Sequence, residues 1–263
     1  MKIHPTALID PQAHLGSGVE VGPYSIIGPY AKIGNDTKIS SHVVIEGHTQ
    51  IGARCTIFPG ACLGTAAQDK KFKDGIAYVS IGDDNVIREY VTINAGSSDG
   101  AKTVLGNKNF IMINCHVGHD CQLGDEITMA NGSTLGGHAV IEDKAVLGGY
   151  AGVHQFVRIG KLAILGAFAK ASMDVPPFSL CDGYPARVYG LNSIGLKRAG
   201  YTSEMSQTLK KAFKLLFMSG LNTTNAVSEL QDKFSNNVDI QHLIKFIKNS
   251  KRGVLRVSVE SKD

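Results

Sequence analysis

Residues 105–147 read LGNKNF-IMINCH-VGHDCQ-LGDEIT-MANGST-LGGHAV-IEDKAV-L, and an aliphatic residue or Met begins each group of six. The same frame starts at Ile3 and ends at Leu165, and 25 of its 28 positions hold such a residue. A period of six fits neither a 3.6-residue helix nor simple strand alternation. It predicts a prism-shaped coil with three short faces, in which stacked turns lie ~4.8 Å apart, as paired strands do, around an aliphatic core.

The three frame positions that break the pattern mark two insertions. Asp69, Gly75 and Asp99 fall in polar segments near 65–80 and 94–103, and the frame resumes in register after each segment. We therefore expect two external loops on the prism. Loops on a rigid scaffold often carry function, so both are candidate site segments, and the alternative is that they are tolerated insertions.

The pattern stops near Ala171, and the run Asp174-Val175-Pro176-Pro177 predicts that the chain leaves the ladder there, because proline lacks the N–H that pairing needs. Apolar residues at helical spacing follow. The sequence predicts a β domain at 1–190 and a small α-helical domain at 191–263. Side chains that can cap the expected helices are Thr202 or Ser203, Thr223 or Thr224, and Asp239.

Composition, charge and the lack of long apolar stretches argue against a nucleic-acid-binding, secreted, membrane-spanning or disulfide-bonded protein. The chain has 263 residues, of which 43% are hydrophobic, as expected of a globular protein. A net charge of +4 does not indicate a nucleic-acid partner, although residues 192–263 carry 12 Lys/Arg against 6 Asp/Glu, or +6. The first residues lack the apolar region of a signal peptide, and no stretch reaches the ~18 apolar residues of a transmembrane segment, so we expect a cytoplasmic protein. Five Cys without a C-x-x-C pair indicate reduced thiols rather than disulfides or zinc ligands.

The densest cluster of reactive side chains lies at 114–121, which reads NCHVGHDC. Two imidazoles beside a carboxylate suggest a general base. One or two coils of 18 residues beyond His119 lead to within one residue of His138 and His154, so we expect three histidines on one edge. A three-histidine zinc site is the competing interpretation. Gln155 and Gly137 are more typical of substrate and oxyanion contacts, and we therefore predict no metal.

Several motifs together are similar to one known family. They are the hexad prism, QDKKF at 68–72, MINCHVGHDC at 112–121, Gly137-His138, VHQF at 153–156, DVPP at 174–177 and GLKR at 195–198. This ordered set resembles the acyl-carrier-protein:UDP-N-acetylglucosamine O-acyltransferases, which catalyse the first step of lipid A synthesis. The resemblance covers essentially the whole chain. It implies a left-handed parallel β-helix followed by a helical domain, a homotrimer with active sites between subunits, and transfer from acyl carrier protein to a UDP-sugar without a cofactor.

The resemblance also implies roles for individual residues. His119 matches the catalytic base for the sugar 3-position, Asp120 matches its orienting partner, and the N–H of Gly137 matches the oxyanion donor. Ala167 matches the end-stop of the acyl groove, with Ile164 as the alternative. Asn192 and Arg198 match nucleotide contacts. Further positions match substrate contacts, namely Gln68, Asp69, Lys71, His116, His138, His154 and Gln155.

Two departures and four alternatives accompany this hypothesis. Ile194 and Ala199 stand where well-known members carry Glu and Arg, which affects the uridine contacts. The same reaction on a 3-amino UDP-sugar would give an amide. The later N-acyltransferase of the pathway has an additional N-terminal domain, for which hexads beginning at Ile3 leave no room. A γ-type carbonic anhydrase would need zinc, and a non-catalytic scaffold would need neither loops nor stacked histidines.

Overall fold

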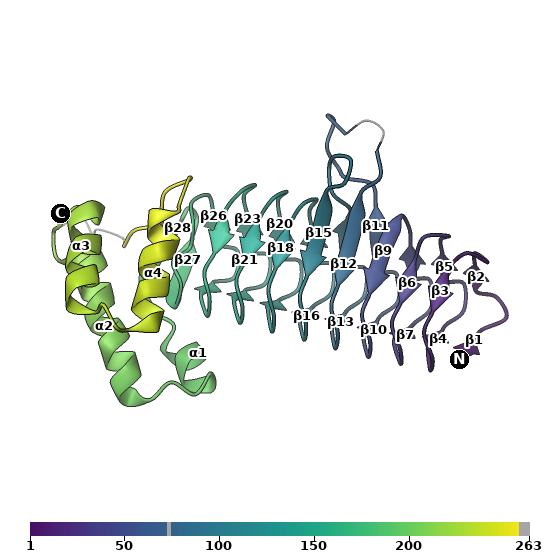
Figure 1. Cartoon of the computed structure of the whole chain (residues 1–263), viewed down its shortest axis with the longest axis horizontal. Helices are drawn as coiled ribbons and strands as arrows, with labels where there is room; N and C mark the ends of the chain where they lie inside the picture. The colour runs from purple at the N-terminus through teal and green to yellow at the C-terminus, as the bar shows by residue number, and fades with distance from the viewer. Residues whose placement is uncertain (73–74, 258–263) are drawn as a thin grey trace.

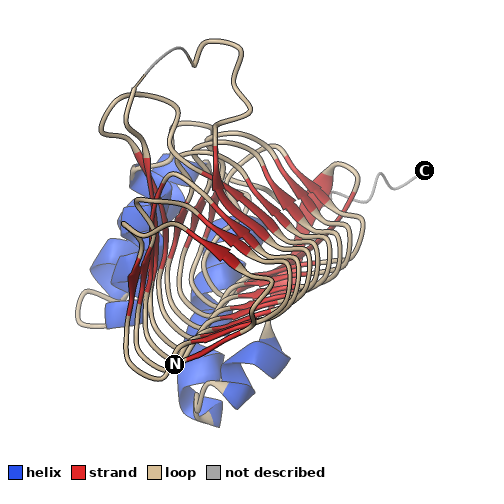
Figure 2. Cartoon of the chain, turned by 90° about the vertical axis from the view of Figure 1, so that its right-hand side faces the viewer, coloured by secondary structure: helices blue, strands red, loops and turns tan. Residues whose placement is uncertain are grey.

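The computed structural model describes residues 1–72 and 75–257 and shows a long prism with helices at its C-terminal end (Figure 1). Viewed along its axis, the prism has three flat faces, each a sheet of very short parallel strands (Figure 2). The hexad prediction of stacked coils with an aliphatic interior is therefore confirmed.

The three faces are built from strands taken in turn along the chain. The first sheet contains β1 (Lys2–Ile3), β4 (Glu20–Val21), β7 (Lys38–Ile39), β10 (Thr56–Ile57), β13 (Val86–Ile87), β16 (Phe110–Ile111), β19 (Thr128–Met129), β22 (Val146–Leu147), β25 (Ile164–Leu165), β27 (Ser179–Gly183) and β28 (Ala186–Leu191). The second contains β2 (Leu8–Ile9), β5 (Ile26–Ile27), β8 (Val44–Ile45), β11 (Cys62–Thr65), β14 (Thr92–Asn94), β17 (His116–Val117), β20 (Thr134–Leu135), β23 (Gly152–Val153) and β26 (Lys170–Ala171). The third contains β3 (His14–Leu15), β6 (Lys32–Ile33), β9 (His48–Ile51), β12 (Tyr78–Ile81), β15 (Lys102–Leu105), β18 (Gln122–Leu123), β21 (Val140–Ile141) and β24 (Arg158–Ile159).

Where no loop is inserted, the register between coils places residues 18 apart directly over one another, and across the loops the paired residues are 24 or 30 apart. Val117 pairs with Leu135, and Leu135 pairs with Val153. The side chains at these frame positions are buried, as are nearly all others of the frame from Val21 onward. Corner residues therefore stack in columns too, and many adopt a positive φ, among them Asp120 at 61° and His138 at 60°.

Both predicted loops leave the prism at one corner, where they project together (Figures 1 and 2). The first joins β11 to β12 and the second joins β14 to β15. Residues 73 and 74, in the first loop, lie outside the described residues. The two loops contact one another, because the Gly100 N–H donates to the Ile76 carbonyl at 2.8 Å and the Ile76 N–H donates to Asp99 Oδ1 at 2.9 Å.

The prediction that the ladder ends at Asp174–Pro177 is wrong. After the two prolines, β27 pairs in parallel with β25, and β28 turns back to pair with β27 in antiparallel fashion. The prolines remove pairing donors only at their own positions, and residues 179–183 supply donors again. The β structure thus continues to Leu191, immediately before the first helix.

Four helices follow: α1 (Ser193–Arg198), α2 (Ser203–Met218), α3 (Thr223–Lys233) and α4 (Val238–Lys248). Thr202 caps α2 as predicted, whereas Asn222 and Asn237 cap α3 and α4, one and two residues before the expected caps. No helix in the described ranges is both long and apolar enough to cross a membrane.

A buried polar group joins the last coils to this helical domain. Asp174 is 1% exposed, accepts hydrogen bonds from the Arg158 N–H and the Ser250 hydroxyl at 2.8 Å each, and lies at the end of the β-helix. His242 of α4 contacts Glu142 at 2.7 Å. The helices are therefore fixed to the prism by side-chain hydrogen bonds as well as by apolar contacts.

The five cysteines are free thiols in the structure, and all but half-buried Cys62 are buried. Burial raises the pKa of Cys121 to about 12, and it also raises the pKa of Cys115. Both thiols therefore stay protonated at neutral pH and act as small apolar side chains.

Candidate active site

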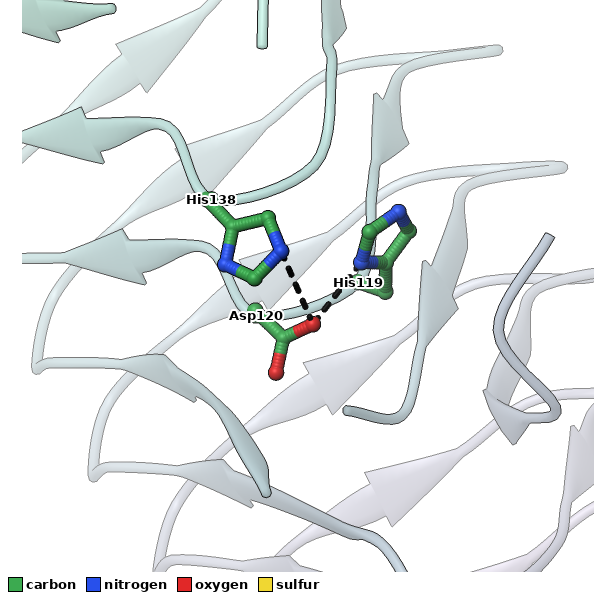
Figure 3. A group of neighbouring side chains, drawn as sticks. All are labelled: His119, Asp120 and His138. Carbon is green, nitrogen blue, oxygen red and sulfur yellow. Dashed lines mark hydrogen bonds and ion pairs between the residues drawn. The ribbon is translucent and has the colours of Figure 1, made fainter. Parts of the chain in front are cut away.

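The corner that follows β17 carries a histidine paired with an aspartate (Figure 3). His119 is 6% exposed, and its Nδ1 lies 2.8 Å from Asp120 Oδ2. Because a carboxylate can only accept at neutral pH, Nδ1 is the donor in this contact, and in the neutral form of the ring Nε2 holds the lone pair. This arrangement is that of an oriented general base.

The Asp120 carboxylate collects several donors on one oxygen. Besides His119, the Ser97 N–H donates to Oδ2 at 3.0 Å, and His138 Nε2 lies 3.6 Å from the same atom. Burial, the largest influence, raises the pKa of Asp120, but the hydrogen bonds from Ser97 and His119 and the charge of His138 outweigh it. The pKa of Asp120 therefore lies below its usual value, and the side chain remains an anion.

Gly137 lies one coil above His119, and its lack of a side chain leaves room for the His119 ring. A Cβ at position 137 would come inside contact distance of Cε1 and Nε2 of the His119 ring. Among the residues that the structure describes, no acceptor is found for the Gly137 N–H. The Gly137 N–H, one coil from the His119 ring, is thus available to an acceptor from outside the chain.

The other histidines of this edge differ in their surroundings. His116 is half-buried, and its Nδ1 lies 2.8 Å from Thr92 Oγ1. Burial, and secondarily the charge of His119, lowers the pKa of His116, so this ring is neutral at pH 7. His138 stacks on Phe156 with 4.5 Å between ring centroids, and it meets the His119 ring edge-on at 5.1 Å.

His154 does not join this cluster. An 18-residue coil produces three adjacent columns at the corner, and His154 stacks on positions 118 and 136, not on His119. Its ring is exposed, with Nδ1 3.2 Å from the Gln155 carbonyl. The three histidines therefore follow one corner in adjacent columns, as expected, and His119 and His138 are the two whose rings are neighbours in the described contacts.

The ligand atoms of His119, Asp120 and His138 lie within 4.8 Å of one another, and they form the one group in the described residues that could hold a metal ion. The chemistry of these donors favours a hydrogen-bonded pair instead. His119 Nδ1 and Asp120 Oδ2 are already partners, so an ion at that place would have to break their bond. The three-histidine set that a γ-type carbonic anhydrase requires is not assembled in the described part of the chain.

The remaining predicted residues of the prism lie on the first loop, on β25 and at the corner after β25. Gln68 and Lys71 are exposed on the first loop, where the Asp69 carboxylate accepts the Lys71 N–H at 2.9 Å and so shapes the turn. Half-buried Ile164 lies on β25, and exposed Ala167 follows that strand at the corner of the first sheet, whereas His119 is at the corner of the second.

Asn192 has a structural role that the sequence did not indicate. Its Oδ1 accepts the Gly195 N–H at 2.9 Å as the cap of α1, and its Nδ2 donates to the Leu162 carbonyl at 2.9 Å. It is 6% exposed. Arg198, in the last turn of α1, is exposed and has no ion-pair partner among the described residues. Arg198 is thus the freer of the two residues to bind an anion.

Sequence reasoning missed three contributors. Thr92 contacts His116, Thr103 Oγ1 accepts the Asp120 N–H at 2.8 Å, and the Ser97 N–H contacts the Asp120 carboxylate. The 18-residue period could have revealed the position of Phe156 over His138, because the two residues are one coil apart. A backbone amide leaves no such signal.

Family profiles and relatives agree with this geometry. A profile described as "Udp N-acetylglucosamine O-acyltransferase; Domain 2" matches residues 174–255, and one of bacterial transferase hexapeptides matches 1–35 and 102–137. A protein of Alkalilimnicola ehrlichii, named acyl-[acyl-carrier-protein]–UDP-N-acetylglucosamine O-acyltransferase, is 49% identical over 256 residues, covering 97% of this chain and 99% of the relative. The chain belongs to this family.

A protein of Janthinobacterium with the same name is also 49% identical, over 259 residues, covering 97% of this chain and 99% of the relative. The structure of a UDP-N-acetylglucosamine O-acyltransferase from Moraxella catarrhalis is similar with a TM-score of 0.94 at 39% identity, covering 97% of this chain and 100% of that one. The corresponding structure from Acinetobacter baumannii has a TM-score of 0.93 at 39% identity, with coverages of 97% and 99%. The predicted left-handed parallel β-helix of hexapeptide repeats with a helical C-terminus is thereby confirmed.

We predict that Gly137→Ala displaces the His119 ring, because the added methyl group needs the space that the ring occupies. The imidazole NMR signals of His119 should shift. Gly152→Ala is the matched control, because a Cβ there meets nothing within 4 Å. Unmoved His119 signals in Gly137→Ala would contradict this account of the glycine.

Proposed function

We propose that this chain transfers a β-hydroxyacyl group from acyl carrier protein to the 3-hydroxyl of UDP-N-acetylglucosamine, the first step of lipid A synthesis, with His119 as general base. The observation that carries the catalytic assignment is the pairing of His119 Nδ1 with Asp120, which leaves Nε2 free beside Gly137. The names of the relatives supply the acyl donor and the sugar acceptor.

The proposed reaction needs only groups that the chain supplies. Nε2 takes the proton from the sugar hydroxyl while the oxygen of that hydroxyl attacks the thioester carbonyl carbon. Asp120 stabilises the imidazolium that forms, and the Gly137 N–H donates to the oxygen that becomes negative. The tetrahedral intermediate then expels the carrier-protein thiolate, which recovers the proton from His119. No cofactor takes part.

Contacts to the acceptor are proposed for residues around this pair. His116, held neutral, can exchange hydrogen bonds with sugar hydroxyls, and Lys71, Asp69 and Gln68 would contact the acceptor from the first loop, which leaves the same corner of the prism as His119. His138, His154 and Gln155 border it on the coils above, and Arg198 suits the diphosphate. A 3-amino sugar is the less favoured acceptor, because the names of the relatives specify UDP-N-acetylglucosamine.

The active unit is proposed to be a homotrimer. Ala167, assigned to the end of the acyl groove, and His119 follow strands of different sheets and so occupy different corners of one prism. One chain therefore does not bring the base and the end-stop to the same cleft. A neighbouring copy that turns its first-sheet corner toward the His119 corner would complete the groove. We place the reaction in the cytoplasm, with no nucleic-acid partner.

The function is tested by His119→Ala. Loss of a positioned general base typically costs ~10²–10⁴-fold in rate, and we expect a loss of that size with an unchanged circular dichroism spectrum. The assay offers β-hydroxyacyl carrier proteins of several lengths with 3-hydroxy and 3-amino UDP-sugars, and mass spectrometry identifies the product. His14→Ala, an exposed histidine on β3, is the control. A His119→Ala enzyme with the wild-type rate would exclude the mechanism.

Docking of the acidic carrier protein should weaken as salt concentration rises, because the helical domain exposes a basic surface and the screening length shrinks to ~10 Å at 0.1 M. The exposed residues of this surface are Lys210, Lys211, Lys214, Lys245, Lys248, Lys251 and Arg252. Lys214→Glu should raise the KM for acyl carrier protein, and Lys38→Glu, on β7 at the far end of the prism, should not. An apparent affinity independent of ionic strength would place the dock elsewhere.

Acyl length should respond to Ala167. One methylene in an apolar pocket is worth about 1–3 kcal/mol, or ~10–200-fold in selectivity. Ala167→Gly should favour longer β-hydroxyacyl donors and Ala167→Met shorter ones, as judged by competition between donors of different length. We expect the wild type to prefer chains of intermediate length. Identical profiles in both variants would point to Ile164 or another side chain as the end-stop.

A further inference from the structure

The second loop reaches the catalytic pair through its backbone. The Ser97 N–H donates to Asp120 Oδ2 at 3.0 Å, and Thr103, where the chain returns to the prism, accepts the Asp120 N–H on its Oγ1 at 2.8 Å. Asp120 has a φ of 61°, an uncommon conformation for a residue with a side chain. The loop therefore contacts both the main chain and the carboxylate of this strained residue.

Hydrogen bonds on both sides hold the Ser97 amide in place. Before it, Asn94 is 2% exposed, and its Nδ2 donates to Thr65 Oγ1 and to the Ala66 carbonyl at 2.9 Å each. After it, the Ala101 N–H donates to the Ser98 carbonyl at 3.0 Å and closes a turn. These contacts tie the loop to the prism, so the amide is a preorganised donor.

We propose that Ser97 is a positioning residue whose backbone N–H holds Asp120 Oδ2 between His119 and His138, and that the second loop exists to supply this donor. The inference rests on the proposed function only in taking His119 as the base. Oδ2 is the atom shared by Ser97, His119 and His138, so rotation of the carboxylate would break all three contacts at once.

A backbone amide suits this role better than a charged side chain. A lysine or arginine at the same place would neutralise much of the carboxylate charge that must stabilise the His119 imidazolium. A neutral N–H fixes the direction of the oxygen, does not titrate, and leaves the charge in place. Although burial raises it, the pKa of Asp120 lies below its usual value, and Ser97 lowers it first through its side chain and also through its backbone N–H, so a backbone ester in place of the Ser97 amide isolates the part that belongs to the N–H.

Ser97→Pro removes the donor and retains a backbone at that position. We expect a ~10–100-fold fall in kcat with little change in KM for UDP-N-acetylglucosamine, the scale of one hydrogen bond to a charged group. The acid limb of the kcat/KM profile should move, because the carboxylate facing the base has changed. Ser98→Pro is the matched control, since no acceptor for the Ser98 N–H is found in the described ranges.

Two further variants separate positioning from a damaged fold. Replacement of the Ser97 amide by a backbone ester removes the N–H without a ring, and it should reproduce the kcat loss with an unchanged melting temperature. In an Asp120→Asn background, Ser97→Pro should cost almost nothing more, because both changes act through one carboxylate. An ester variant with wild-type kcat and pH profile, or fully additive losses with Asp120→Asn, would overturn the proposal.

An NMR titration of the His119 ring in the substrate-free enzyme tests the positioning without any activity. The midpoint of the chemical-shift titration should move in the ester variant and stay in place in Ser98→Pro. If the wild type transferred no acyl group, the proposed function would fail while this titration still decided the role of Ser97. An unmoved curve in an active enzyme would overturn the role of Ser97 alone.

Discussion

The interior of the prism accepts an aliphatic side chain at every sixth residue and a mostly small one two positions before it, and the other features of the molecule depend on this constraint. Three such repeats complete a coil, so each corner residue beyond the second loop stands over the one 18 positions earlier. Gly137 is therefore over His119, and His138 is over Asp120. The catalytic geometry follows from the same register that fills the core, and insertions are possible only where the chain can return to the frame, as it does at both loops.

The fold was predictable because a core of stacked coils needs an aliphatic side chain at every sixth residue, and this period is visible in the sequence. The loops were predictable for the same reason, as were the neighbours of His119 one coil away. For His154 this reasoning is accurate to one residue: it lies at the same corner as His119 but in the adjacent column, and its ring is exposed. The return of the chain as β27 and β28 was missed because no hexad marks it.

Other parts of the site were hidden because they depend on backbone atoms or on local caps. The Ser97 N–H would be the same donor on almost any side chain, so no residue type announces it. Asn192 shows the opposite case. The resemblance matches it to a nucleotide contact, which stays a prediction, and the structure adds that its side-chain polar atoms cap α1 and bind the Leu162 carbonyl. Sequence shows which groups are present but not which of them are already satisfied.

Because the coils repeat, no single corner of one chain presents both His119 and Ala167. Each corner of the prism presents one column of side chains, and the columns of His119 and Ala167 belong to different corners. If His119 is the base and Ala167 ends the acyl groove, as proposed, the groove combines two corners, and a second copy would offer the missing one without any new structure. On this argument the straight, unbranched β-helix is suited to side-by-side association, because a register that aligns one pair of coils aligns all the others. The catalytic pair, braced by the second loop within its own chain, would then be complete before association, and the length of the acyl groove would be set by the neighbour.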